Sequence, residues 1–346
     1  MKMRDVMRRL TAVAMLFWLT AFSSAPAAAQ LRVVATTTDV TCLADSVGGS
    51  LVTVTSIGTG REDVHMLAAK PSFMVQANRA DLWIRQGLEL EIGFEPLVIE
   101  GARNPDIHPG RRGHLDVSRG VHLLDVPTGP VDRSMGDVHP MGNPHYHLDP
   151  LNGRIMARNI LDRLVELDPD NRETFTKNYQ AFIERLDRAM FGDEAAEAVE
   201  AERLWSLHTA GTLDALLEER DLPAGGWHAL LAPWRGTRLV TYHRSWGYFA
   251  RRFGLVVVDE LEPKPGIPPS PRHLASLVAR MQALDVKVIL MEPFYSRRAP
   301  DLVAERTGAV VVEVGNMVGS EPAASDYIRM IDNIVRRMAE ALEGQP

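Results

Sequence analysis

Three histidines each follow a segment that is predicted to be a buried β-strand, a position that suits a metal site. They are His65 after residues 52–57, His145 after residues 121–126, and His243 after residues 238–242. In open α/β sheets, ligands bind beyond the carboxyl ends of the strands, where loops from different strands meet. Neutral imidazole is a common ligand of divalent metals, so a metal site is one interpretation. The separations of 80 and 98 residues match no local zinc motif, so ordinary hydrogen-bonded loop histidines remain an alternative.

Composition restricts the ligands and the partners. Cys42 is the only cysteine, so the chain cannot close an internal disulfide or build a cysteine-type zinc or iron–sulfur site. Any metal must therefore use His, Asp or Glu. Lys and Arg number 38 against 45 Asp and Glu, giving a formal net charge of −7. A protein without a basic surplus is a poor partner for a phosphate backbone, so we expect no nucleic-acid partner.

The elements that would position the histidines fall into two similar halves. Short β-rich segments cover 32–37, 52–57, 80–85 and 121–126 in the first half, and 238–242, 255–258, 287–291 and 309–313 in the second. Mostly apolar strands that alternate with helical stretches are typical of parallel sheets covered on both faces. The sequence therefore predicts an α/β protein with two four-stranded α/β lobes.

A long helix is predicted between the lobes. Phe175, Phe182, Leu186 and Met190 fall on one helical stripe, and Asp168 and Pro169 provide a start signal. Residues 193–202 are expected to extend a helix, whereas the irregular order of Gly, Pro, Trp and His in 221–235 predicts an insertion without regular structure. We divide the chain into a signal peptide (1–29), an N-terminal lobe (30–152), linking helices (153–191), an insertion (192–236) and a C-terminal lobe (237–346).

The first 29 residues have the pattern of a secretory signal peptide. A basic start, an apolar run from Leu10 to Phe22 and a small-residue stretch ending at Ala29 form the three expected regions. The apolar run is shorter than the ~20 residues that span a bilayer. Cleavage after Ala29 removes four basic residues and one acidic residue, which takes the formal charge from −7 to −10. With no cysteine at the cleavage site for lipid attachment, we expect a protein free in a bacterial periplasm.

Four separated motifs resemble a known family. They are Asp63-Val64-His65 with Pro71-Ser72, Asn143-Pro144-His145-Tyr146 with Leu148-Asp149-Pro150, Thr241-Tyr242-His243 with Trp246-Gly247-Tyr248, and Glu262-Pro263 with Gly266-Ile267-Pro268-Pro269-Ser270. In this order they resemble the zinc/manganese solute-binding proteins of bacterial ABC importers. The resemblance implies two lobes joined by a long rigid helix, one metal ion in the cleft between them, and an inner-membrane ABC permease as partner. It also implies that His65, His145 and His243 are the metal ligands.

The sequence departs from the family in ways that leave the fourth ligand open. Where the family usually has a late acidic ligand, this chain has Asn316. The fourth position is then water, Asn316 through its carbonyl oxygen, or Glu292. His147 stands where the family commonly has an aromatic residue, and we interpret it as a rim residue with an accessory ligand as the alternative. His139 is a second accessory candidate. It lies in a segment with fewer His and Asp residues than the His/Asp-rich loop found in some zinc members of the family.

Ligand chemistry favours zinc. Three neutral imidazoles suit Zn²⁺, whereas Mn²⁺ prefers more carboxylate oxygen. The sequence thus predicts a monomeric periplasmic component that captures Zn²⁺ for an ABC permease and performs no chemistry. Open alternatives are the same role for Mn²⁺ or another divalent metal, a metal-dependent hydrolase, and a binder of an organic solute. Loading by a periplasmic metallochaperone is also left open.

Overall fold

The computed structural model describes residues 30–129, 139–262, 264 and 266–344. The chain from Leu31 onward forms one compact unit, and every element below belongs to it. The predicted signal peptide and residues 130–138 lie outside the described residues. Within the described part of the chain, none of the helices combines the length and the apolar character needed to cross a membrane.

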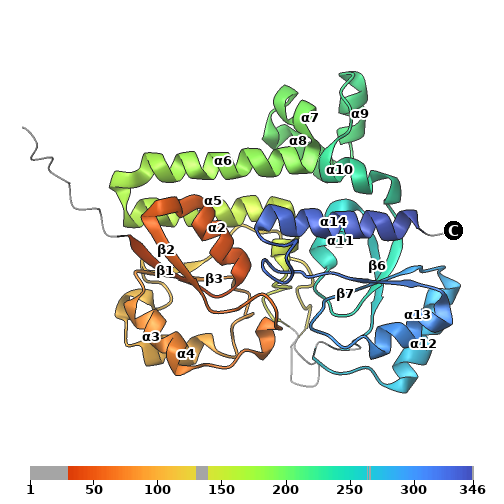
Figure 1. The fold of residues 1–346 in the computed structure, drawn as a ribbon, viewed down its shortest axis with the longest axis horizontal. Helices are drawn as coiled ribbons and strands as arrows, with labels where there is room; N and C mark the ends of the chain where they lie inside the picture. Colours follow the sequence, from red (N-terminus) through yellow and green to blue (C-terminus); the bar gives the residue numbers. More distant parts are fainter. Residues whose placement is uncertain (1–29, 130–138, 263, 265, 345–346) are drawn as a thin grey trace, which may run out of the picture. The chain divides into compact units, whose positions relative to one another are not determined.

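Two four-stranded sheets form the framework, as the sequence predicts (Figure 1). All pairings within them are parallel, and the strand orders are β2-β1-β3-β4 and β6-β5-β7-β8. The strands are β1 Leu31–Ala35, β2 Val52–Ser56, β3 Leu82–Arg85, β4 His114–Asp116, β5 Arg238–Thr241, β6 Val256–Glu260, β7 Val288–Met291 and β8 Val310–Glu313. Each sheet has a switch in strand order beside its first strand, where ligands bind in folds of this class.

Seven of the eight predicted strands lie where expected, and the fourth was misplaced. The apolar alternation of residues 121–126 predicts a strand, but β4 is His114–Asp116. Asp125 has φ of 54°, which no strand residue adopts, and Val126 is 49% exposed. The apolar residues of 121–126 therefore do not lie in the sheet, and none of the described residues between β4 and His145 forms a strand.

Alternate residues of the central strands pack on opposite faces of each sheet. In the first sheet, Val33 and Ile84 join the cluster that contains the linking helices, while Val34 and Trp83 join a separate cluster under α3 and α4. This alternation follows from the two-residue period of a strand. The helices in and around the first lobe are α2 Thr38–Gly48, α3 Pro71–Arg79, α4 Glu95–Ala102 and α5 Pro150–Leu167. The helices in the second lobe are α11 Gly247–Phe253, α12 Pro271–Ala283, α13 Arg298–Thr307 and α14 Tyr327–Glu343.

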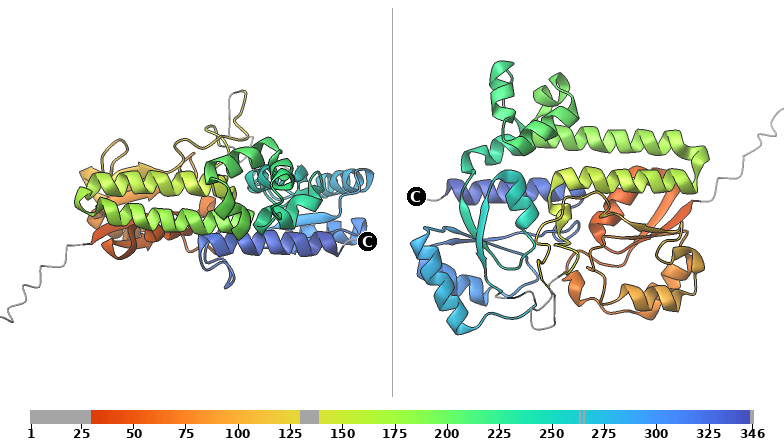
Figure 2. Two further views of the ribbon diagram at one scale, coloured as in Figure 1. Left: turned by 90° about the horizontal axis from the view of Figure 1, so that it is seen from above. Right: turned by 180° about the vertical axis from the view of Figure 1, so that it is seen from behind.

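The predicted long helix is α6, Arg172–Phe191, which runs beside α5 in both views of Figure 2. Its buried residues include Phe175, Phe182, Leu186 and Met190, the stripe expected from the sequence. It contacts α2 of the first lobe as well as α14 of the second, so one rigid element touches both lobes. The helix ends at Gly192, whose φ of 82° favours glycine.

Short helices make up the segment between α6 and β5. They are α7 Asp193–Ala198, α8 Ala201–Ala210, α9 Leu213–Glu219 and α10 Gly226–Leu231. The expectation that 221–235 is irregular was therefore wrong in part, because Trp227 and Leu231 are buried apolar residues that anchor α10 against α6 and α14. The boundaries drawn for the lobes and the insertion remain predictions.

The loop after β8 ties the second lobe to the first. Met317 packs in the apolar cluster that contains Val34 and Trp83 of the first sheet. The backbone N–H of Val318 donates to the Asp39 carboxylate at the start of α2 (3.1 Å). The two sheets are therefore joined beside the ends of β1 and β8 and not only by the long helix.

Candidate metal centre

His65 is held by the residue that precedes its turn. It lies in the short 3-10 turn Val64–Met66 after β2, and Asp63 caps this turn by accepting from the His65 backbone N–H (3.0 Å). The same carboxylate oxygen accepts from His65 Nδ1 at 2.6 Å. One aspartate thus fixes both the backbone and the ring, and the ring's Nε2 is left as the nitrogen that faces away from Asp63.

His243 is oriented in the same way by the second lobe. It follows β5, and its Nδ1 donates to Glu262 Oε2 (2.7 Å), a residue just beyond β6. A carboxylate on the outer nitrogen of a metal-binding histidine fixes the tautomer and the ring orientation. Asp63 and Glu262 both lay inside the recognised motifs, but the sequence analysis gave them no role. The signal that could have found them was a carboxylate two residues before one histidine and another at the end of the neighbouring strand.

His145 reaches the same place from the loop that precedes α5. Asn143 Oδ1 accepts from the His145 backbone N–H at 2.9 Å, and His145 is 5% exposed. Neither of its ring nitrogens has a hydrogen-bond partner among the described residues. A buried polar nitrogen without a partner is costly, and a metal ion is one way to satisfy it.

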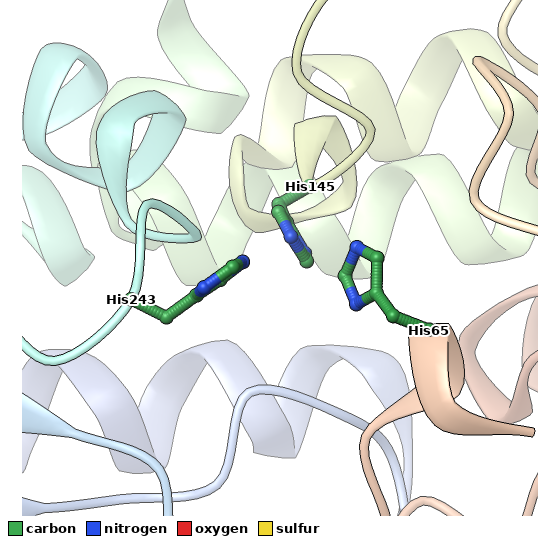
Figure 3. A group of neighbouring side chains, drawn as sticks. All are labelled: His65, His145 and His243. Carbon is green, nitrogen blue, oxygen red and sulfur yellow. The ribbon is translucent and has the colours of Figure 1, made fainter. Parts of the chain in front are cut away.

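The three rings converge on one point between the lobes (Figure 3). One nitrogen from each of His65, His145 and His243 lies within 4.8 Å of the other two. The ring centroids are 5.2 to 5.6 Å apart. Among the described residues, this is the only group of three or more His, Cys, Asp or Glu side chains with such spacing. The structure therefore brings together the three histidines that the sequence singled out.

The surroundings keep His145 in the neutral form. Burial lowers the pKa of His145 well below its usual value, and the neighbouring His65 and His243 lower it further. Burial alone would raise the pKa of Asp63, but the hydrogen bonds from His65 outweigh it and the net pKa is lowered. The inner imidazole is thus in the form that binds a metal, and one outer carboxylate is in the form that accepts from its histidine.

Glu292 and Asn316 lie together, and Glu292 is not part of the three-histidine group. Glu292 Oε1 accepts from Ser245 Oγ and from Asn316 Nδ2, the latter at 3.2 Å. Burial raises the pKa of Glu292 to about 8. Glu292 Oε2 and Asn316 Oδ1 are both buried without a hydrogen-bond partner among the described residues. The two residues hold each other beside the site, and neither is fixed as a ligand by its contacts.

His147 is not a rim residue, contrary to the sequence interpretation. Its side chain is fully buried, its Nδ1 accepts from Gln86 Nε2 at 3.0 Å, and its Nε2 donates to the Asn316 backbone carbonyl at 2.9 Å. With both nitrogens engaged, His147 joins the end of β3 to the loop after β8. No local sequence signal indicates this role, because the partners are 61 and 169 residues away.

His139 is the second accessory candidate, and it does reach the site. Its Nε2 lies 3.0 Å from His65 Nε2, and the two ring centroids are 5.1 Å apart. Burial and the neighbouring His65 and His243 lower the pKa of His139 to about 3. Four histidines therefore gather in one small volume, and His139 comes from a loop whose path the sequence could not predict.

Comparison with known proteins identifies the family. The family described as zinc-uptake complex component A, periplasmic, matches residues 33–201 and 213–341. The chain belongs to this family. The match leaves out residues 202–212, which cover most of α8 and the turn after it.

Relatives in this family carry names for different metals. The iron-binding protein YfeA of Yersinia pestis is 26% identical over 94% of this chain and 95% of its own length. The manganese ABC transporter substrate-binding lipoprotein scaA of Streptococcus gordonii is 32% identical over 47% of this chain and 50% of its own. A crystal structure of a ZnuA 138–173 deletion mutant with zinc bound has a TM-score of 0.66 at 22% identity, covering 92% of this chain and all of the other. This structural likeness supports the two-lobed fold.

Proposed function

We propose that this protein is the periplasmic zinc-binding component of an ABC importer, and that it delivers the ion to a membrane permease. The observation that carries the proposal is the convergence of His65, His145 and His243, with both nitrogens of His145 lacking a partner in the described chain. The family membership supports the transport role. The mature chain is proposed to be a monomer that starts at Gln30 and holds one ion.

The donor set favours zinc over the metals named for some relatives. The group contains three imidazoles and no carboxylate. Imidazole nitrogens suit Zn²⁺, whereas Mn²⁺ is better held by carboxylate and carbonyl oxygen. Asp63 and Glu262 instead accept from the outer ring nitrogens of His65 and His243, and they are not part of the three-histidine group. A carboxylate there strengthens the imidazole as a donor without supplying the oxygen that Mn²⁺ prefers.

The origin of the ligands in both lobes accounts for capture and release. His65 and His145 belong to the first half of the chain, and His243 to the second sheet. Tyr295, after β7, also donates to Asp63 Oδ2 across the lobes (3.3 Å). An ion held by all three histidines therefore links the lobes, and a permease that separates them would remove His243 from the ion.

Metal titration of the mature chain tests the proposal. The protein is purified, stripped with a chelator, and titrated with Zn²⁺, Mn²⁺ and Fe²⁺ against a chromophoric competitor. We expect one Zn²⁺ per chain, bound more tightly than the other two. Zinc at 1,000 times its Kd would add about 4 kcal/mol to the free energy of unfolding. Tighter binding of Mn²⁺ or Fe²⁺ would show the same role for a different metal, and failure to bind any ion at micromolar concentration would overturn the proposal.

A further inference from the structure

We propose that His139 is the fourth metal ligand and that it makes the site all-nitrogen, which sets its selectivity for zinc. The inference rests on the proposed function, because it concerns the coordination of the same ion. It starts from the contact of His139 Nε2 with His65 Nε2 at 3.0 Å.

The contact is made by the nitrogen that His65 offers to the centre. Its other nitrogen, Nδ1, donates to the Asp63 carboxylate, so in neutral His65 the proton is on Nδ1 and Nε2 carries a lone pair. Two imidazole nitrogens 3.0 Å apart need either a proton or a cation between them. His139 is therefore directed at the electron pair that would bind the ion.

The spacing is close to that of two ligands on one zinc ion. Zn–N bonds of about 2.0–2.1 Å in a tetrahedral site place the ligand nitrogens about 3.3 Å apart. A shift of a few tenths of an ångström would bring Nε2 of His139 and Nε2 of His65 to the spacing of two ligands of one zinc ion. His139 is not within 4.8 Å of all three other histidines, so its ring must also turn toward His145 and His243. If its proton is on Nε2, it moves to Nδ1 through solvent, and the ring stays neutral.

The other candidates for the fourth position are held by other contacts. Glu292 Oε1 accepts from Ser245 and Asn316, and Glu292 is outside the group. The amide nitrogen of Asn316 is used in the same contact, which leaves only a neutral amide oxygen. His147 uses both ring nitrogens. His139 is the remaining imidazole near the centre. Glu292 Oε2 has no hydrogen-bond partner among the described residues and is the competing donor, but His139 already contacts one of the three histidines directly.

A fourth imidazole changes the selectivity as well as the affinity. Four neutral nitrogens in a tetrahedral arrangement suit Zn²⁺ and give little to Mn²⁺, which prefers several hard oxygen donors. Replacing one imidazole by a carboxylate should move the site toward Mn²⁺. The ratio of zinc to manganese affinity therefore reports whether His139 touches the ion.

The experiment compares four single variants of the mature chain. They are His139→Ala, His139→Asp, His65→Ala and His122→Ala, the last being an exposed loop histidine as a matched control. Affinities for Zn²⁺ and Mn²⁺ are measured by competition. We expect His139→Ala to weaken zinc binding by roughly 10²–10³-fold, as the loss of a direct ligand would, and by more than the roughly 10–100-fold that an outer partner of a ligand is worth. His139→Asp should lower the zinc to manganese affinity ratio at least tenfold, and His122→Ala should match the wild type.

X-ray absorption of the zinc-loaded wild type gives a second measurement, for which no variant is needed, and four imidazole nitrogens are expected. The same measurement on His139→Ala should show three. If His65→Ala abolishes zinc binding while His139→Ala behaves like His122→Ala, or if the wild type shows three imidazoles, the inference is wrong and the proposed function stands. If His65→Ala binds zinc as well as the wild type does, the proposed site itself fails.

Discussion

Two pairs of histidines in this protein have rings the same distance apart but different surroundings. The ring centroids of His65 and His145 are 5.2 Å apart, and so are those of His208 and His228. In the first pair, a carboxylate holds the outer nitrogen of His65, and neither ring nitrogen of His145 has a partner among the described residues. In the second pair, an arginine contacts each ring. The spacing of two imidazoles therefore does not by itself define a metal site.

The arginines make the second pair unsuitable for a cation. Arg252 Nη1 donates to His208 Nδ1 at 3.4 Å, and Arg235 Nη2 donates to His228 Nδ1 at 3.3 Å. His228 Nε2 donates in turn to Asp214 at 2.7 Å. A guanidinium occupies the lone pair that a metal would need and adds a positive charge beside it.

The two pairs also differ in their place in the fold. His65 and His243 follow strands near the switch points of the two sheets, whereas His208 is on α8, in the segment that the family match leaves out. There Arg252 also binds Asp149 through Nε and Nη2, at 2.7 and 2.8 Å. Asp149 caps the helix α5 that follows His145. The second pair is thus part of the packing behind the site.

The largest expected effect separates the two pairs directly. Replacing His65, His145 or His243 by Ala removes one ligand. If structural zinc sites with four ligands are worth about 10–16 kcal/mol, each ligand contributes about 2.5–4 kcal/mol, or a loss of roughly 10²–10³-fold in affinity. His208→Ala and His228→Ala are expected to leave zinc affinity unchanged. Competition titration measures all five, and zinc binding weakened by His208→Ala would contradict the distinction.

A smaller effect is expected from the carboxylates that orient the rings. Asp63→Asn and Glu262→Gln keep the shape of each side chain but weaken the contact with Nδ1 of His65 or His243. Zinc affinity should fall by roughly 10–100-fold. Asp214→Asn, the equivalent change beside His228, is the control and should have no effect on zinc. Equal affinities for Asp63→Asn and the wild type would show that the carboxylate does not orient a ligand.

The pH dependence of stability tests the second pair. Burial, and to a smaller extent the positive charge of Arg252, lowers the pKa of His208 to about 3, against 6.5 for an ordinary histidine. Between these values the unfolded chain takes up a proton that the folded protein does not, so stability falls as the pH drops below about 6.5. The contribution is at most about 1.4 kcal/mol per pH unit. Denaturant unfolding at pH 7, 6 and 5 measures the free energy of unfolding at each pH. With or without zinc, this free energy should fall less steeply with decreasing pH for His208→Gln than for the wild type. Equal slopes for the two proteins would contradict the prediction.

The smallest effects on zinc affinity are expected from the residues beside the site. Asn316→Ala removes a neutral oxygen that water can replace. Glu292→Gln keeps the contacts with Ser245 and Asn316, and the raised pKa means that much of its charge is already absent at pH 7. Both variants should bind zinc within roughly tenfold of the wild type, by the same titration. An Asn316→Ala defect as large as that of His65→Ala would show that the amide is a ligand.

Local patterns were sufficient for most of the fold. The apolar run 287–291 predicts a strand, and β7 lies there at Val288–Met291. The stripe from Phe175 to Met190 gave α6. These signals depend on neighbours within a few residues, so the sequence contains them directly. The prediction of a strand at 121–126 was wrong, because the apolar alternation of these residues resembles that of a strand. The real strand, β4, begins at the polar His114, which is buried against Glu95, so its pattern does not indicate a strand.

Local sequence patterns predict the two α/β lobes, the helix between them and the three histidines that lie beyond or near the ends of the sheets. The groups that surround those histidines depend on tertiary packing. His139 meets His65 across 74 residues, and Asn316 meets His147 across 169. His208, which has the same residue type, is brought to Arg252 instead. Secondary structure follows from local periodicity, whereas the charge and hydrogen bonding at a ring nitrogen depend on which distant segments pack against it.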